Sequence, residues 1–214
     1  MTESKPSWHL DDAAVIAAAA PYTFYKPSQQ AIALLRPGNL VKLIFPFVSH
    51  DPKAPLAERM WVRIERVEQD CFLGVLDNDP RHITDLKAGD AIEFEGRHIV
   101  ETDIDDPEPD PTASYRLKCL VTRRVLEDGH RVGYLYRQQP DQEDDSGWRI
   151  TVGDETQEYM ADSKNCAYVS LGEVLSVDDS FRDLLGSASP CAYAREKSTG
   201  EFEPVEPPAD GGSI

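Results

Sequence analysis

Residues 61–76, with the sequence WVRIERVEQDCFLGVL, decide the fold class of the chain. From Trp61 to Val67 apolar and polar residues alternate, which is the period of a strand with one buried face. Cys71–Leu76 is a second apolar run, and the polar residues 68–70 between the two runs predict a turn. The stretch therefore predicts two antiparallel neighbours in a sheet of short strands.

Further elements are expected on both sides of this hairpin. Strands are predicted at 39–48, 91–95 and 98–101, a helix capped by Ser28 is predicted up to Leu35, and a short helical piece is predicted at 84–87. The alanine-rich residues 13–20 follow two acidic residues, which cap a helix well but do not suit the positively charged start of a signal peptide. We expect a helix there, and a cytoplasmic protein.

An acidic segment separates two halves of the chain. Residues 101–111 hold six acidic residues, three prolines and no basic residue. Like charges repel and proline removes a hydrogen-bond donor, so this composition predicts an exposed linker. We expect an N-terminal tail with a short helix (1–24), a β-rich domain (25–103), a linker (104–114), an α+β domain (115–205) and a disordered tail (206–214).

The second half shows the same short elements. Strands are predicted at 117–126, 131–136, 148–152, 167–169 and 191–195, with 148–152 in the centre of the sheet. Asp128-Gly129 is a favoured type I′ pair and predicts a hairpin between the first two strands. Residues 155–160 suit a short helix or loop, and 171–185 suit one amphipathic helix or two short ones broken near Asp178. The expected class is α+β, with two small domains that each combine a short-stranded antiparallel sheet with one or two helices.

The net charge of −17 is the strongest signal in the composition. It would repel nucleic acid and anionic membranes, and no stretch approaches the roughly 20 apolar residues of a membrane span. It would attract a basic protein and speed the encounter. Plain solubility is the alternative explanation of the same charge, and the oligomeric state stays open.

Motifs for chemistry are missing from the sequence. It contains no Gly-rich phosphate loop, no nucleophile elbow and no His-Glu-x-x-His, so we expect no catalytic residues, no metal site and no cofactor. The four cysteines, at 71, 119, 166 and 191, are scattered and are interpreted as reduced core thiols. The enzyme alternative, a Cys- or His-dependent hydrolase, would need a low-pKa cysteine beside a histidine.

Acidic loops flank the predicted strand that begins at Trp148. We expect them to form a partner-binding surface in which aromatic residues supply affinity and carboxylates steer a basic partner. Taken singly, Trp148 also fits a core position, and Tyr159 also fits beneath its own loop. The predicted partner-binding residues are Asp144, Asp145, Trp148, Asp154, Glu155, Glu158 and Tyr159.

Several short pieces of the second half carry a family resemblance. They are CLVT at 119–122, VGYLYR at 132–137, DSGWR at 145–149 and EYM at 158–160. In this order they resemble immunity-protein family thirty-three of bacterial polymorphic toxin systems, over roughly residues 115–205. The resemblance implies toxin neutralisation by binding and brings no catalytic residues with it.

The first half resembles another small bacterial domain of unknown function, through LDNDP at 76–80 and LKAGD at 86–90. This resemblance implies an accessory binding or scaffold role. The sequence therefore favours a non-enzymatic immunity protein whose partner is a protein such as a basic toxin domain. The alternative is a cytoplasmic adaptor or regulatory module unrelated to toxins.

Overall fold

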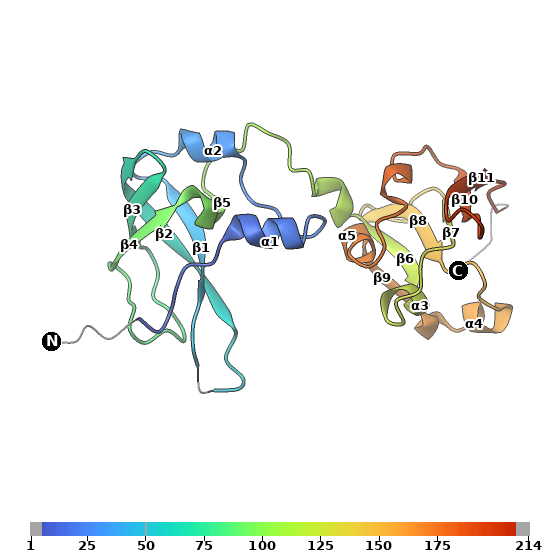
Figure 1. The fold of residues 1–214 in the computed structure, drawn as a ribbon, viewed down its shortest axis with the longest axis horizontal. Helices are drawn as coiled ribbons and strands as arrows, with labels where there is room; N and C mark the ends of the chain where they lie inside the picture. The colour runs from blue at the N-terminus through green and yellow to red at the C-terminus, as the bar shows by residue number, and fades with distance from the viewer. Residues whose placement is uncertain (1–5, 50, 209–214) are drawn as a thin grey trace. The chain divides into compact units, whose positions relative to one another are not determined.

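The computed structural model describes residues 6–49 and 51–208. The chain forms two compact units, Met1–Asp110 (unit 1) and Pro111–Ile214 (unit 2), and each has a sheet of its own (Figure 1). The boundary between them lies inside residues 104–114, the segment with the composition of a linker.

Two short helices of unit 1 begin where the sequence predicts them. Helix α1 spans Ala13–Ala19 and is capped by the Asp12 carboxylate, and helix α2 spans Gln29–Leu34 and is capped by the Ser28 hydroxyl. Each cap accepts hydrogen bonds from backbone N–H groups that lack a partner in the first helical turn.

The sheet of unit 1 is antiparallel throughout, in the order β4-β3-β2-β1-β5. Its strands are β1 (Leu40–Pro46), β2 (Ala57–Glu68), β3 (Cys71–Leu76), β4 (Ala91–Glu95) and β5 (Ile99–Thr102). The predicted hairpin over residues 61–76 is confirmed as β2 and β3, and Gln69 turns the chain between them with a φ of 55°. The short 3-10 helix η1 (Gly96–His98) joins β4 to β5.

Both faces of β1 are covered. Val41, Leu43 and Phe45 point into the main core, to which α2 contributes Ile32. Ile44 points to the other side and packs in a smaller cluster that includes a residue of α1. Alternate residues of a strand face opposite sides, so one apolar strand can serve both cores.

Two expectations for unit 1 need correction. Residues 84–87 form bends and no helix, because the carboxylates of Asp79 and Asp90 accept from backbone N–H groups of this loop and hold it in turns. The acidic segment is also not free along its whole length. Asp106 accepts hydrogen bonds from the Tyr25 hydroxyl (2.6 Å) and the Ser28 N–H (2.7 Å), which fastens residue 106 to the start of α2.

Unit 2 consists of short elements around one sheet of six strands, in the order β11-β10-β7-β8-β6-β9. The strands are β6 (Lys118–Thr122), β7 (Tyr134–Arg137), β8 (Asp145–Thr151), β9 (Cys166–Ser170), β10 (Cys191–Arg195) and β11 (Phe202–Val205). The helices are α3 (Arg123–Leu126), α4 (Gln157–Ala161), α5 (Leu171–Leu175) and the 3-10 turns η2 (Ala113–Arg116), η3 (Ser163–Asn165) and η4 (Arg182–Leu184). The predicted α+β class is confirmed, and so are the central position of the strand at Trp148 and the division of 171–185 into two pieces.

The predicted hairpin at Asp128-Gly129 is wrong. Strand β6 ends at Thr122, and α3 follows at once with Val125 buried, so the chain leaves the sheet before the turn. Strand β7 then pairs with β8 and β10, and β8 lies parallel to β6. The sheet therefore contains one parallel pair among antiparallel ones. The expected tail, 206–214, lies for the most part outside the described residues.

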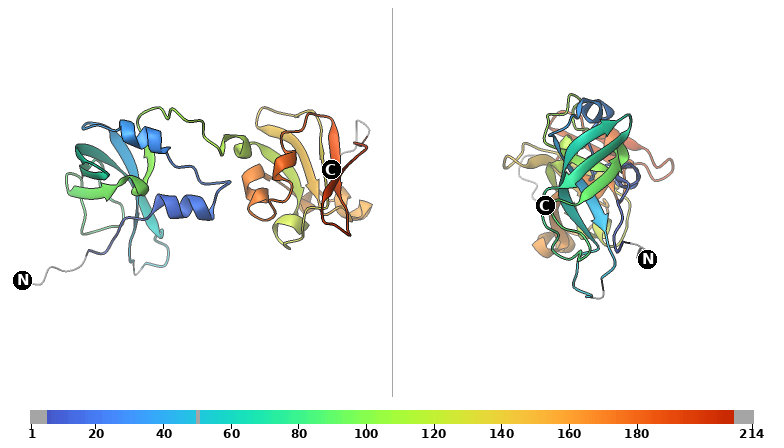
Figure 2. Two further views of the ribbon diagram at one scale, coloured as in Figure 1. Left: turned by 45° about the horizontal axis from the view of Figure 1, so that its top comes forward. Right: turned by 90° about the vertical axis from the view of Figure 1, so that its left-hand side faces the viewer.

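The two faces of the unit 2 sheet differ in what covers them. Leu171 of α5 and Leu185, which follows η4, border a cavity together with Trp148, so these segments cover the face to which Trp148 points. Figure 2 shows these segments, in orange, on one side of the sheet. The strand register places Tyr136, Arg149 and Tyr168 in one row on the opposite face. A charged side chain thus lies on the face away from α5.

Candidate functional site

Strand β8 begins with a buried ion pair. The Asp145 and Arg149 side chains are only 1% and 3% exposed, and they meet through two bonds, Nη1 to Oδ1 at 3.0 Å and Nη2 to Oδ2 at 2.9 Å. Asp145 also accepts from the N–H groups of Asp141 (2.9 Å) and Gly147 (3.0 Å). Burial opposes ionisation, but these bonds outweigh it and hold the pKa of Asp145 below its ordinary value.

This geometry corrects the expectation that Asp145 meets a partner. Its oxygens are occupied inside the unit, where they orient Arg149 and close the turn before β8. Asp141 adds a second carboxylate to Arg149, at 2.9 Å, and its own side chain is 72% exposed. The cluster therefore consists of a buried ion pair, Asp145 with Arg149, and one carboxylate at the surface, that of Asp141.

Trp148 is likewise a core residue and no surface anchor. It is 1% exposed, and its indole lies beside the Arg137 guanidinium, with 5.8 Å between the guanidinium carbon and the ring centroid. The expectation that it contacts a partner is corrected because the strand that carries it is buried at every position. Of the two interpretations of Trp148, the core one fits the structure.

An exposed polar group lies at the start of β8. The Asp144 carboxylate forms an ion pair with Lys118 Nζ (2.9 Å) and accepts from the Tyr168 hydroxyl (3.2 Å), which in turn accepts from Gln142 Nε2 (3.0 Å). The bond from Lys118 is the main reason that the pKa of Asp144 is lowered. Lys118 Nζ also lies 5.3 Å from the ring centroid of Tyr168. Lys118, Gln142 and Tyr168 were not among the predicted site residues.

The second acidic loop follows β8. Asp154 is exposed and pairs with Arg124, and Glu158 is exposed in the first turn of α4. Glu155 is used internally, because it accepts from the Thr122 hydroxyl (2.7 Å) and from two backbone N–H groups of the turn. Burial opposes its ionisation, yet these bonds lower its pKa. Tyr159 is partly buried, with its hydroxyl 3.4 Å from the carbonyl oxygen of Asn165.

The two acidic loops do not form one patch. They lie at opposite ends of β8, whose seven residues span roughly 20 Å. The structure therefore offers two separate acidic regions: one around Asp144, beside Lys118 and Tyr168, and one around Asp154 and Glu158, beside α4. Neither has Trp148 at its surface.

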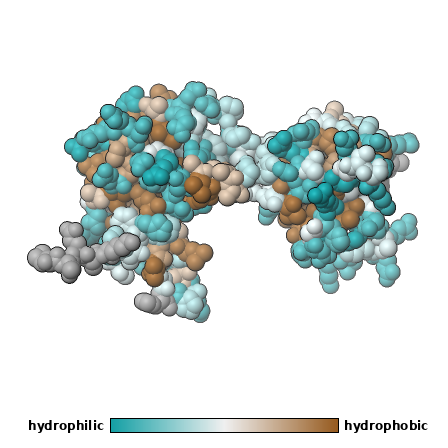
Figure 3. Space-filling model, in the orientation of Figure 1, coloured by the Kyte–Doolittle hydropathy of each residue, from teal (hydrophilic) through white to brown (hydrophobic). Residues whose placement is uncertain are grey.

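Negative charge is also spread over the whole chain. Acidic residues exceed basic ones to a similar degree in unit 1 and unit 2. Hydrophilic side chains cover the visible face of each unit in many places, interrupted by small hydrophobic areas (Figure 3). Many carboxylates are used locally, as Asp12 at a helix cap and Glu155 at a turn. The net charge therefore does not mark one surface.

The cysteines show no sign of activation. Burial raises the pKa of Cys119 to about 12, and it is also the first cause of the raised pKa of Cys71, Cys166 and Cys191. A raised pKa keeps a cysteine as a thiol, which is a poor nucleophile. Within residues 6–49 and 51–208, no group of three or more His, Cys, Asp or Glu side chains is placed to hold a metal ion. In the same residues, no helix is long and apolar enough to cross a membrane.

Comparison with known families divides the chain as the structure does. Residues 13–105 match the family described as "Uncharacterized protein conserved in bacteria (DUF2314)", which lies within unit 1. No curated protein and no solved structure in the comparison matches the chain. Residues 119–206 match the family described as "Immunity protein Imm33 domain", and they hold all six strands of the unit 2 sheet apart from the first residue of β6.

Proposed function

We propose that the chain is an immunity protein that neutralises a bacterial toxin in the cytoplasm by binding it directly. The Imm33 match over a complete folded sheet carries this proposal, because an immunity domain implies a protein partner such as a toxin. The raised cysteine pKa values and the lack of a metal-binding cluster in the described residues agree with a binding role.

Unit 2 has two acidic regions suited to steer a basic toxin. The α4 region presents Asp154 and Glu158 next to Tyr159, and its carboxylates are well exposed. The Asp144 region is partly neutralised by Lys118 but offers Tyr168 as an aromatic contact. Carboxylates at the rim raise the association rate, whereas a tyrosine contributes area at low entropic cost. We assign the first contact to the α4 region because Glu158 has no ion pair within the described residues.

Co-expression tests the function. Candidate toxin domains encoded next to this gene are produced in a bacterial host with and without the chain, and growth is measured. We expect one of them to stop growth and the chain to restore it, with a complex recovered by size-exclusion chromatography. If no neighbouring product is toxic, or none is rescued, the proposal fails.

Charge reversal tests the surface. Glu158→Lys and Asp154→Lys are expected to slow association with the rescued toxin at least tenfold at low salt, and much less at high salt, because screening weakens exposed charges. Asp144→Lys reports on the other region. Glu203→Lys is the matched control, since Glu203 is an exposed carboxylate of β11 at the far edge of the sheet from β9. Equal slowing by Glu203→Lys would show that only net charge matters.

An adaptor role is the second candidate, and unit 1 is the observation that favours it. Unit 1 has its own core and matches a family of uncharacterised bacterial proteins. Affinity capture from the native bacterium would favour an adaptor if it recovered a housekeeping enzyme, and a gene neighbourhood without secreted effectors would point the same way.

A further inference from the structure

A cavity in unit 2 has two arginines among its lining residues and no acidic residue. It measures about 250 Å³ and lies between the sheet face that carries Trp148 and the segments that cover this face. Its wall includes the side chains of Arg137, Arg182 and Trp148 together with Leu117, Leu171 and Leu185. The Arg182 guanidinium is paired with the Asp183 carboxylate at 3.0 Å, so Arg137 is the cation of the wall that no carboxylate pairs within the described residues.

The indole of Trp148 supplies a second, independent observation. Trp148 is 1% exposed, and its Nε1–H has no hydrogen-bond acceptor among the described residues. A buried donor without an acceptor costs roughly 1–3 kcal/mol, so such donors are rare in folded proteins. An acceptor that enters the cavity beside Trp148 would remove this cost.

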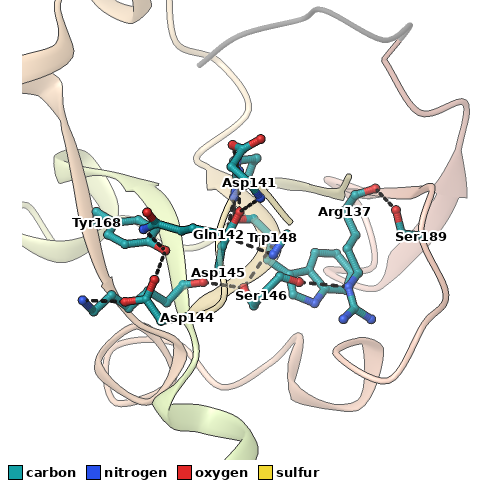
Figure 4. Close-up of polar contacts among 12 residues, drawn as sticks. Arg137, Asp141, Gln142, Asp144, Asp145, Ser146, Trp148, Tyr168 and Ser189 are labelled. Carbon is teal, nitrogen blue, oxygen red and sulfur yellow. Dashed lines mark hydrogen bonds and ion pairs between the residues drawn. The ribbon is translucent and has the colours of Figure 1, made fainter. Parts of the chain in front are cut away.

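Arg137 is held where it can share that acceptor. Its Nε donates to the Ser146 carbonyl oxygen (3.1 Å) and its Nη1 to the Ser187 carbonyl oxygen (2.7 Å), which fixes the guanidinium beside the indole (Figure 4). Nη2 has no bond to any of the described residues. The guanidinium carbon lies 5.8 Å from the centroid of the indole ring. The two donors cannot satisfy each other, but both can donate to the two oxygens of a carboxylate.

We infer that this cavity is a binding site for a small carboxylate. The guanidinium of Arg137 and the Trp148 indole would donate to the carboxylate, and the leucines would enclose a compact apolar body. The volume suits one small acid, or the last residue of a protein chain, and is too small for a longer segment. Both sources offer the same chemistry, a carboxylate on an apolar group. This site is independent of the toxin contact proposed for the exposed carboxylates.

Nuclear magnetic resonance of the three tryptophan indoles tests the site directly. The full chain is titrated with benzoate and, in parallel, with benzamide, which has nearly the same shape without the charge. Trp8→Phe and Trp61→Phe identify the Trp148 signal by elimination. We expect benzoate to shift the Trp148 indole signal in a saturable way, and benzamide to leave it in place. A missing shift, or equal shifts with both compounds, would overturn the inference.

Variants link the shift to the cavity. Arg137→Gln is expected to weaken benzoate binding at least tenfold, and Arg131→Gln, a change at an exposed arginine outside the cavity, is expected to have no effect. Arg137 also supports the fold through two backbone carbonyls, so Arg137→Met, which keeps much of the side-chain length and removes the charge, serves as a second variant if the first does not fold. Unchanged affinity in a folded Arg137 variant would exclude the site.

A peptide arm separates the two sources of the carboxylate. A pentapeptide that ends in phenylalanine is titrated with a free and with an amidated C-terminus. A shift of the Trp148 signal by the free peptide alone assigns the site to a chain end, and a shift by benzoate with no response to either peptide assigns it to a small acid. Equal responses to the free and amidated peptides would contradict recognition of a carboxylate.

Discussion

Replacing Asp145 by asparagine should strongly destabilise unit 2, although the sequence alone indicated that Asp145 lies in an exposed acidic loop. The change keeps the shape of the side chain but removes its charge, and it leaves the Arg149 guanidinium buried with one exposed carboxylate, that of Asp141. An amide nitrogen in place of a carboxylate oxygen also faces a guanidinium, a donor against a donor. Loss of one partner of a buried ion pair costs about 3–5 kcal/mol.

The same arginine provides the matched control. Asp141→Asn removes the other carboxylate from Arg149, but that side chain is 72% exposed, so the expected loss is at most about 1 kcal/mol. Asp145→Leu combined with Arg149→Met removes both buried charges and should recover part of the stability lost by Asp145→Asn, because no buried charge remains unpaired. The recovery is partial because the N–H groups of Asp141 and Gly147 lose their acceptor.

Urea unfolding followed by tryptophan fluorescence measures these differences. Trp148 is the single tryptophan of unit 2, so a background with Trp8→Phe and Trp61→Phe reports this unit alone. With a typical urea slope of about 2 kcal/mol/M, Asp145→Asn should lower the midpoint by roughly 2 M. A shift no larger than that of Asp141→Asn would refute the assignment of Asp145 to the core.

Three further outcomes follow from the structure. Gly147→Ala should cost roughly 1–3 kcal/mol by urea unfolding, because residue 147 has a φ of 79° and its Cβ would lie 2.2 Å from the Gln138 carbonyl oxygen, whereas Gly186→Ala, with open space around it, should be neutral. Unit 2 should lose stability as the pH falls below 3.8, the ordinary pKa of Asp145, because the lowered pKa keeps the folded carboxylate ionised while the unfolded chain takes up protons; constant stability down to pH 2 would contradict this. The four cysteines should react with a thiol reagent at pH 7 much more slowly than glutathione does, and one fast cysteine would revive the enzyme alternative.

Local patterns predicted most of the strands but not all of their partners. The alternation in β2 and the compact turn at Gln69 define a hairpin whose two strands are neighbours in sequence. The parallel pair of β6 and β8 joins strands separated by α3 and β7, and no local pattern encodes such a contact. Asp128-Gly129 had the composition of a hairpin turn, but the buried Val125 in the preceding helix outweighs this local preference.

The burial of Asp145 could have been predicted in part. Residues 145 and 149 are four apart in one strand, so their side chains share a face of the sheet, and opposite charges on one face can pair. What the sequence could not show is that the fold buries both side chains and brings the Asp141 carboxylate to the same arginine. In an exposed position the same two residues would form a surface ion pair that contributes little to stability.

The cavity beside Arg137 and Trp148 could not be predicted from the sequence, for a similar reason. Arg137, Arg182 and Trp148 come from three separate segments, and composition alone reports only that acidic residues dominate the chain. Which side chains line a cavity depends on which segments the fold brings together. Figure 4 shows two of these side chains side by side, although 11 positions separate them in the sequence.

Some acidic residues of unit 2 therefore stabilise the fold, whereas others are available to contact a partner. Asp145 and Glu155 satisfy backbone and side-chain donors inside unit 2, so their replacement should reduce stability and any binding together. Glu158 is exposed and its carboxylate accepts from no donor among the described residues, so reversing its charge should change the free energy of unfolding little. A toxin complex that weakens with Glu158→Lys while the urea midpoint stays constant would thus identify a contact residue. The same loss from Asp145→Asn, with its lower midpoint, would carry no information on the interface.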